Sequence, residues 1–282
     1  MVTQRTTGGN TVYFMGMVSA AGWWYYFPVV YFLKLPLAFH FLTIMALLGA
    51  ISLIKKPFYT EPLQKLKKWV SNHFTEFSMM IFLIIYWLAS MTGNLNIGVR
   101  HILPSFPFVY ILVCLAIKNR IEVIKKTNLK KMAVFLVSVL LGFYVISSIT
   151  SFPYYLSYFN EISGGVKNGY KYVVDSNYDW GQDLKRLTKF VEQNKIEKIY
   201  IDYFGGSNPK YYLKEKCEYW QGTKSSDEFP KNNYLAVSAT LLQGGRGNPA
   251  LNFDQPTNYY LWLNKYQPIT RIGTSIFVYY ID

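Results

Sequence analysis

Four apolar stretches separated by basic loops constrain this 282-residue chain more than any other feature of its sequence. Leu37 to Ile54 provides 18 residues without a formal charge. As a helix this run would rise about 27 Å, close to the ~30 Å hydrocarbon core of a bilayer. Residues 77–92, 102–117 and 132–149 are further apolar runs. The sequence therefore predicts about four transmembrane helices within residues 37–149.

The basic residues indicate how these helices are oriented. Two loops, residues 54–77 and 117–132, carry eleven lysines and arginines between them, whereas the loop 93–101 carries only Arg100. Basic loops stay on the cytoplasmic side of a membrane. The loop 93–101, the N-terminal segment and everything after Ser151 are therefore predicted to lie outside, in a multi-pass plasma (inner) membrane protein.

The same charge distribution argues against nucleic-acid binding. Residues 1–149 carry 14 Lys and Arg against 3 Asp and Glu, and residues 150–282 carry 15 against 13. The basic excess therefore lies in loops between apolar runs, where membrane topology explains it. The second half has no basic face with interleaved aromatic residues, so no nucleic-acid partner is expected.

The N-terminal segment, residues 1–36, is rich in aromatic residues. Trp23, Trp24, Tyr25, Tyr26 and Phe27 form one block before Pro28. Trp and Tyr prefer the headgroup level of a bilayer, so this segment is predicted to lie at the outer membrane surface. An ordinary aromatic belt is the alternative interpretation.

Residues 150–282 have the pattern of an extracytoplasmic α/β domain. A strand at 171–174, a helix at 179–194 and a strand at 197–203 would form a parallel crossover unit. Further segments resemble strands at 234–239 and 276–281, with a short helix at 259–264. The predicted fold class is thus a membrane α-helical unit followed by an α/β domain.

Two polar stretches are candidates for chemistry. In the first, NLNIGVRHILPSFPF (94–108), Arg100 and His101 fall between apolar runs, and an ionisable residue at membrane depth is a functional-site candidate. In the second, DSNYDWGQD, a tryptophan and three carboxylates fall between a strand end and a helix start: Trp180, Asp175, Asp179 and Asp183. Ligands bind beyond the carboxyl ends of parallel strands, and Trp180 could stack on a sugar face.

A structural interpretation of the second stretch is equally open. Ser176, Asn177 or Asp179 could cap the helix, while Asp183 complements the positive end of its dipole. No spacing of His, Cys and carboxylates in the sequence resembles a metal site.

Several of these stretches together resemble a known family. GWWYYFPVVYFLKLPL (22–37), GVRHILPSFPFVYIL (98–112), SFPYYLSYFNEISGG (151–165) and DSNYDWGQDL (175–184) are similar to the C-terminal part of polytopic glycosyltransferases of the GT-C superfamily. The similar branch contains the dolichyl-phosphate-mannose protein mannosyltransferases and the bacterial lipid A aminoarabinose transferases. The resemblance covers nearly the whole chain.

This resemblance implies transfer of a sugar from a polyprenyl-phosphate carrier to an acceptor at the outer membrane face. It places Arg100, with His101 and Lys34, near the lipid phosphate. Six further residues are expected either to contact the acceptor or to have a structural role: Tyr25, Tyr26, Asp175, Asp179, Trp180 and Asp183. A divalent metal is the one cofactor that the resemblance suggests.

One departure from the family bears on activity. The family's catalytic carboxylate lies in the first outer loop of a longer chain, and this sequence has no outer acidic residue between Met1 and Asn160. The chain is therefore expected to be the C-terminal portion of such an enzyme, inactive alone, with an N-terminal half encoded upstream as its partner. The alternative is a noncatalytic, membrane-anchored module that binds glycan or protein.

Overall fold

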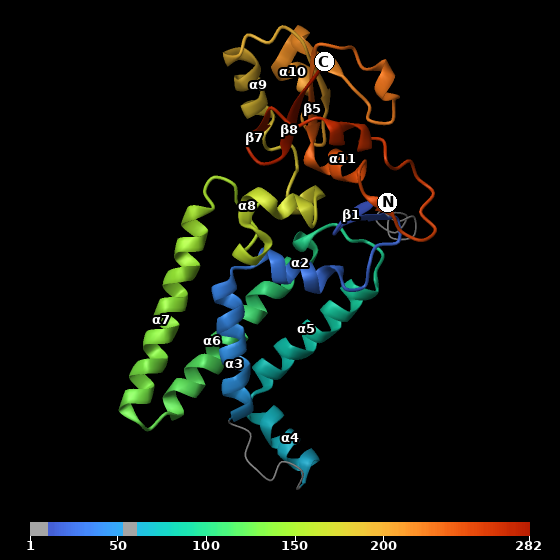
Figure 1. The fold of residues 1–282 in the computed structure, drawn as a ribbon. Helices are drawn as coiled ribbons and strands as arrows, with labels where there is room; N and C mark the ends of the chain where they lie inside the picture. Colours follow the sequence, from blue (N-terminus) through green and yellow to red (C-terminus); the bar gives the residue numbers. More distant parts are fainter. Residues whose placement is uncertain (1–10, 53–60) are drawn as a thin grey trace. The chain divides into compact units, whose positions relative to one another are not determined.

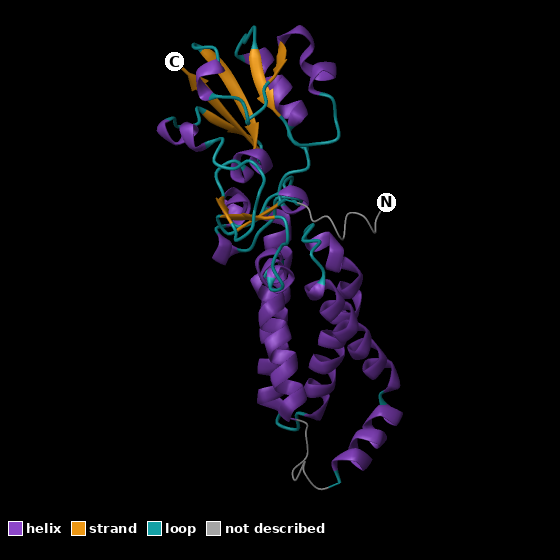
Figure 2. Ribbon diagram, turned by 90° about the vertical axis from the view of Figure 1, so that its right-hand side faces the viewer, coloured by secondary structure: helices purple, strands orange, loops and turns teal. Residues whose placement is uncertain are grey.

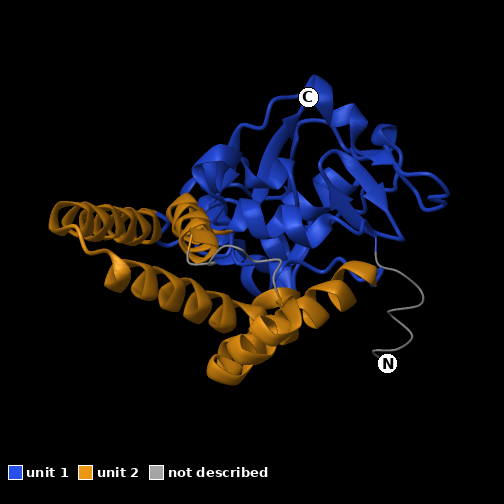
Figure 3. Ribbon diagram, turned by 90° about the horizontal axis from the view of Figure 1, so that it is seen from below, with its two compact units in different colours: residues 1–34, 93–100, 151–282 blue, residues 35–92, 101–150 orange. Residues whose placement is uncertain are grey.

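The computed structural model describes residues 11–52 and 61–282, which cluster into two compact units (Figures 1 and 3). Unit 1 comprises the chain up to Lys34 together with Gly93–Arg100 and Ser151–Asp282. Unit 2 comprises Leu35–Thr92 and His101–Thr150. The N-terminal residues that the sequence assigned to a separate surface segment thus cluster with the second half of the chain.

Unit 2 is entirely helical in its described part. Its helices are α3 (Leu37–Ser52), α4 (Pro62–Asn72), α5 (Phe74–Thr92), α6 (Phe106–Val123) and α7 (Thr127–Thr150). The 3₁₀ helix η1 (Val99–Ser105) leads directly into α6.

Three helical stretches of the described chain are long and apolar enough to cross a membrane: Phe74–Thr92, Val99–Val123 and Thr127–Thr150. A fourth is added if α2 (Tyr26–Lys34) and α3 are counted as one broken span. The apolar runs at 77–92, 102–117 and 132–149 are therefore confirmed as helices of this kind. The predicted run 37–54 is helical as far as Ser52, and its last two residues lie outside the described residues.

The two prolines of the 102–117 run lie where the helix tolerates them. Pro104 is inside the 3₁₀ helix η1, and Pro107 is in the first turn of α6. Proline lacks an N–H, but the first amides of an α-helix have no intrahelical acceptor. Helix α6 therefore starts after Ser105 without losing a backbone hydrogen bond to Pro107.

The helices of unit 2 expose apolar side chains on most of their surface. Ile85 on α5 is 63% exposed and Phe135 on α7 is 69% exposed. Within the unit, α3 packs on α6 and α7, with the rings of Phe39 and Tyr110 4.5 Å apart. Helices that are apolar all round and yet exposed are typical of membrane spans, because lipid replaces the missing protein neighbours.

Unit 1 is built around a mixed five-stranded sheet with the order β4-β3-β5-β8-β7 (Figure 2). The strands are β3 (Ile199–Asp202), β4 (Cys217–Tyr219), β5 (Asn233–Ser238), β7 (Thr270–Ile272) and β8 (Ile276–Ile281). Strands β4, β3 and β5 are parallel, whereas β8 pairs antiparallel with both β5 and β7. The strands predicted at 197–203, 234–239 and 276–281 are thereby confirmed.

Helix α9 (Leu184–Gln193) covers one face of this sheet. Its buried residues Leu184, Leu187 and Val191 recur at helical spacing and belong to the same core cluster as Ile199 and Ile201 of β3. Short elements complete the domain: η2 (Glu161–Ser163), α8 (Gly165–Asn168), η3 (Gly169–Lys171), η4 (Asp175–Asn177), α10 (Pro209–Leu213), η5 (Lys214–Lys216), η6 (Ser226–Glu228), α11 (Ala239–Gly244) and η7 (Leu261–Lys265).

A second, three-stranded sheet involves the N-terminal segment. Strands β1 (Val12–Phe14) and β2 (Met17–Ser19) form a hairpin, and β2 pairs in parallel with β6 (Asn248–Pro249). Phe14 also forms a single bridge to Val173. Residues from both ends of the chain therefore form this sheet of unit 1.

Two predictions for the α/β domain are wrong. Residues 171–174 do not form a strand of the sheet, because Lys171 ends the 3₁₀ helix η3 and Tyr172 has helical dihedral angles (φ −99°, ψ −52°). Val173 makes only a single bridge, to Phe14. The helix predicted from Asp179 starts at Leu184, because Gly181 has φ 79° and no α-helix can pass through that conformation. The crossover unit predicted from these two elements is therefore absent from the described sheet.

Candidate functional site

The DSNYDWGQD segment connects three parts of unit 1. The Asn177 side-chain amide donates to the Tyr26 hydroxyl at 2.8 Å, and its Oδ1 accepts from the backbone N–H of Val99 at 2.9 Å. Its backbone carbonyl accepts from Lys34 Nζ at 2.7 Å. Asn177 is fully buried. Sequence reasoning considered this residue only as a helix cap, and it instead fixes α2 and the 93–100 loop against residues 175–183.

The close approach of the 93–100 loop depends on a glycine. Gly98 has φ 105°, and a Cβ atom on it would lie 2.7 Å from the Ser176 hydroxyl oxygen. The Ser176 hydroxyl donates to the carbonyl of Ile97 in this loop. A side chain at position 98 would therefore push the loop, and Arg100 with it, away from the DSNYDWGQD segment.

Asp183 is a buried structural carboxylate. Its Oδ2 accepts from the backbone N–H groups of Thr274 at 2.8 Å and Ser275 at 2.9 Å, and from the Ser275 hydroxyl at 3.0 Å. Its Oδ1 accepts from Arg186. Asp183 occupies the N-cap position of α9 but makes no side-chain cap hydrogen bond. It therefore ties α9 to the β7–β8 turn, and the helix-capping roles predicted for Ser176, Asn177 and Asp179 are wrong.

Asp179 is fully buried as well. Its carboxylate accepts from the backbone N–H of Thr240 at 3.1 Å and from that of Gly181 at 3.3 Å. Burial raises the pKa of Asp179 to about 7, because removal from water disfavours the charged form more than these bonds favour it. Asp179 thus links the DSNYDWGQD segment to α11.

Asp175 is the one of the three carboxylates that lines a cavity. The cavity has a volume of about 410 Å³, and Tyr26, Asn96 and Thr240 also line it. Burial raises the pKa of the half-buried Asp175, while the charge of Arg100 opposes the shift. Of the candidates in this segment, Asp175 combines access to a cavity with a perturbed pKa, which is the usual combination at functional sites.

Asn96 also lines this cavity and carries a buried donor without a partner in the described chain. The residue is only 2% exposed; its Oδ1 accepts from the backbone N–H of Trp23 at 2.6 Å, and its Nδ2 has no partner among the described residues. A buried donor without an acceptor costs about 1–3 kcal/mol. This polar residue of the 93–100 loop was not singled out from the sequence, although its place in a predicted outer loop was a usable signal.

Arg100 lies on Trp180. The guanidinium carbon is 4.5 Å from the centre of the Trp180 ring, which is itself 52% exposed. The Nε of Arg100 is buried and has no hydrogen-bond acceptor in the described part of the chain. Arg100 also forms no ion pair within 4.0 Å there. Two residues predicted separately are thus brought together, and the guanidinium retains donors for a ligand.

The other predicted site residues have different surroundings. Lys34 donates to the carbonyls of Leu156 (2.8 Å) and Asn177 (2.7 Å), so two of its three donors bind the chain itself. Tyr25 is exposed, and its ring lies near that of Phe14. His101 belongs to unit 2, where its carbonyl accepts a hydrogen bond from the Tyr86 hydroxyl.

No group of three or more His, Cys, Asp or Glu residues within 11–52 and 61–282 is arranged to hold a metal ion. Comparisons with protein-family models, with curated proteins and with solved structures find no match to this chain. The assignment of a function therefore depends on the geometry of unit 1 and on the sequence motifs.

Proposed function

We propose that this chain is the donor-phosphate-binding, C-terminal portion of a membrane glycosyltransferase. The enzyme would transfer a sugar from a polyprenyl phosphate to an acceptor at the outer face of the membrane. The observation that carries the proposal is the Arg100 guanidinium: it is stacked on Trp180, its Nε is buried without an acceptor, and no described carboxylate pairs with it.

In such a transfer reaction, an arginine in this position would stabilise the leaving phosphate. As the bond between the sugar and the lipid phosphate breaks, negative charge grows on the phosphate oxygens. A planar guanidinium can hold two of these oxygens through charge-assisted hydrogen bonds. Trp180 restricts the guanidinium to one plane, so less reorganisation is needed when that charge develops. Arg100 would act there by binding and orienting the phosphate.

Asp175 would help to define the other side of the site. Asp175 lines a cavity that Tyr26 and Asn96 also line, so its carboxylate would meet a sugar or an acceptor hydroxyl bound there. Burial raises the pKa of this carboxyl above its ordinary value, which is the direction that favours a general acid or base. This chain would thus supply the phosphate ligand and part of the acceptor environment.

Donor binding is the first test of this proposal. Replacing Arg100 by alanine should weaken binding of a fluorescent polyprenyl phosphate about tenfold to a hundredfold, because a hydrogen bond to a charged group contributes ~1.5–3 kcal/mol. Binding would be measured for the whole chain in phosphatidylcholine nanodiscs. The matching polyprenol without phosphate should bind equally weakly to both proteins.

Arg271→Ala is a matched control. Arg271 is also a stacked arginine of unit 1, 5.5 Å from the Tyr170 ring centre, but its Nη1 donates to the Lys167 carbonyl. This variant should bind the phosphate as the unaltered chain does. If both variants lost the same affinity for polyprenyl phosphate, or if Arg100→Ala lost none, Arg100 would not be the phosphate ligand.

The topology is a separate part of the proposal, with unit 1 outside and the two basic loops in the cytoplasm. A cysteine at Leu251, which is 93% exposed in unit 1, should react with a membrane-impermeant maleimide in intact cells. A cysteine at the exposed Asn128 should react only after the membrane is permeabilised. The unaltered chain, which already carries the exposed Cys114, measures the background labelling. Reaction at Asn128 in intact cells would reverse the orientation.

A further inference from the structure

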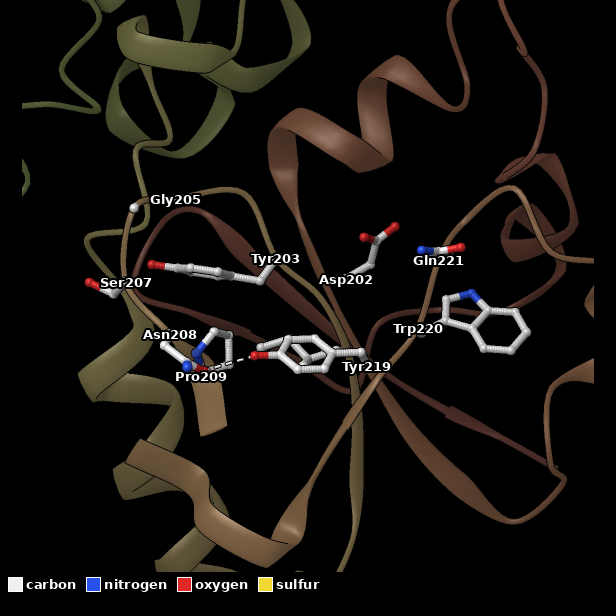
Figure 4. A pocket seen from close by; sticks show the side chains of 11 residues that line it. Asp202, Tyr203, Gly205, Ser207, Asn208, Pro209, Tyr219, Trp220 and Gln221 are labelled. Carbon is white, nitrogen blue, oxygen red and sulfur yellow. Dashed lines mark hydrogen bonds between the residues drawn. The ribbon is translucent and has the colours of Figure 1, made fainter. Parts of the chain in front are cut away.

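A second cavity of unit 1 lies at the carboxyl ends of the parallel strands β3 and β4 (Figure 4). Its volume is about 500 Å³, which accommodates one or two sugar rings. Its lining comes from the end of β3, the loop that follows it and the end of β4. Ligands often bind just beyond the carboxyl ends of parallel strands. The loops that follow the strands separate there, so their side chains can contact a ligand.

Aromatic rings form a large part of this lining. Tyr203, Tyr219 and Trp220 all border the cavity, as Figure 4 shows. Tyr219 is 49% exposed, and its hydroxyl donates to Asn208 Oδ1 at 2.8 Å, which holds the ring in place. Large exposed rings that are held by a hydrogen bond offer a rigid apolar surface, such as the C–H face of a pyranose can cover.

Polar groups with free hydrogen-bonding capacity adjoin these rings. Asp202 Oδ2 accepts from the Tyr260 hydroxyl and from the backbone N–H of Gly222, and both of its described bonds use that oxygen, so Oδ1 remains available. Trp220 is 5% exposed, and its Nε1 has no acceptor among the described residues. Because Trp220 Nε1 is itself buried, the group that the cavity offers to a sugar hydroxyl is the free Asp202 oxygen, an acceptor.

The charges of the lining restrict the class of ligand. One carboxylate, Asp202, and no lysine or arginine line the cavity. A phosphate or a carboxylate would meet repulsion from Asp202 without a cation in the lining, whereas a neutral polyol would not. Lys210 and Lys224 lie 5.5 and 5.7 Å from the ring centres of Tyr219 and Trp220, outside the lining, so a sugar phosphate belongs among the probes.

We infer that this cavity binds a neutral pyranose of a glycan. Its residues differ from those around Arg100 and Asp175, so the inference stands independently of the proposed donor site. Bound to the proposed enzyme, such a sugar would belong to the acceptor or to a product glycan rather than to the lipid donor.

The test is saturation-transfer NMR on the whole chain in phosphatidylcholine nanodiscs, since alkyl-glycoside detergents would compete for the cavity. The probes are methyl glycosides of glucose, mannose, galactose and N-acetylglucosamine. At least one should show transfer to its ring C–H protons, with a dissociation constant in the millimolar range that a single sugar ring reaches. Glucose 1-phosphate should bind no more tightly than the methyl glucoside.

Substitutions at three positions test whether the saturation transfer comes from a glycoside bound in this cavity. Tyr219→Ala should weaken glycoside binding about tenfold, whereas Tyr219→Phe, which keeps the ring, should retain most of it. Tyr211→Ala removes a 77% exposed tyrosine outside the cavity and should change nothing. Arg100→Ala should bind polyprenyl phosphate more weakly but bind the glycoside as the unaltered chain does. This result would distinguish the glycoside cavity from the proposed donor site.

Three outcomes would overturn the inference. These are the absence of transfer to every glycoside, equal binding by the Tyr219→Ala and unaltered chains, and tighter binding of the sugar phosphate than of the glycoside. Glycoside binding retained by Tyr219→Phe would show that the domain still folds when residue 219 is changed.

Discussion

Replacing Asp183 by alanine is expected to destabilise unit 1 by about 3–5 kcal/mol, because each buried donor that loses its acceptor costs about 1–3 kcal/mol. The carboxylate is fully buried and accepts from two backbone N–H groups, a hydroxyl and Arg186. Alanine would leave the donors of Thr274 and Ser275 buried without an acceptor. The anchor between α9 and the β7–β8 turn would be lost.

The measurement is denaturant-dependent proteolysis of the whole chain in nanodiscs, followed at cleavage sites in unit 1. Asp175→Asn is the matched control, and its expected effect is within about 0.5 kcal/mol. Asp175 faces a cavity, and asparagine tolerates the positive φ that this position requires. Equal stability of Asp183→Ala and the unaltered chain would show that the Asp183 bonds do not anchor the helix.

The second large effect concerns pH and Asp179. Its folded-state pKa of about 7 is above the ordinary value of 3.8, so between these values the folded state holds a proton that the unfolded state has released. Its contribution to stability is therefore fully present below about pH 4 and is lost as the pH rises to about 7. Over that interval the free energy of unfolding should fall by about 4 kcal/mol through this group, since each pKa unit is about 1.4 kcal/mol.

Asp179→Asn isolates this contribution from that of other carboxylates. Asparagine keeps an acceptor for the Thr240 N–H but cannot titrate. The difference in unfolding free energy between the variant and the unaltered chain should therefore change by several kcal/mol between pH 4.5 and pH 8. If the unfolding free energies of the variant and of the unaltered chain changed in parallel with pH, Asp179 would be ionised in the folded chain over this range.

These two carboxylates clarify the role of the whole DSNYDWGQD segment. Asp179 and Asp183 hold α11 and the β7–β8 turn, and Asn177 holds Tyr26 and Val99. Asp175 alone of the three carboxylates lines a cavity. The described contacts of Asn177, Asp179 and Asp183 are therefore structural, which leaves Asp175 and Trp180 as the residues of this segment for the proposed site.

Local patterns were sufficient to predict the long apolar helices of unit 2 and part of the sheet of unit 1. An apolar run of spanning length has few alternatives to a membrane helix, because no backbone polar group can remain unpaired in lipid. The strands at 197–203, 234–239 and 276–281 were predicted correctly because each one alternates or concentrates apolar residues over a short length. The strand predicted at 171–174 was wrong because Lys171 and Tyr172 have helical backbone conformations, which composition does not reveal.

The candidate site was predictable only as separate residues. The sequence by itself determined that Arg100 is an ionisable residue between apolar runs and that Trp180 and Asp175 occur in a polar turn. Only the tertiary structure decided that Trp180, 80 positions away, covers the Arg100 guanidinium, and that Asn177 attaches this turn to Tyr26 and Val99. The physical reason is that apolar burial depends on local composition, whereas a buried polar group is satisfied by whichever donor or acceptor the folded chain brings within reach.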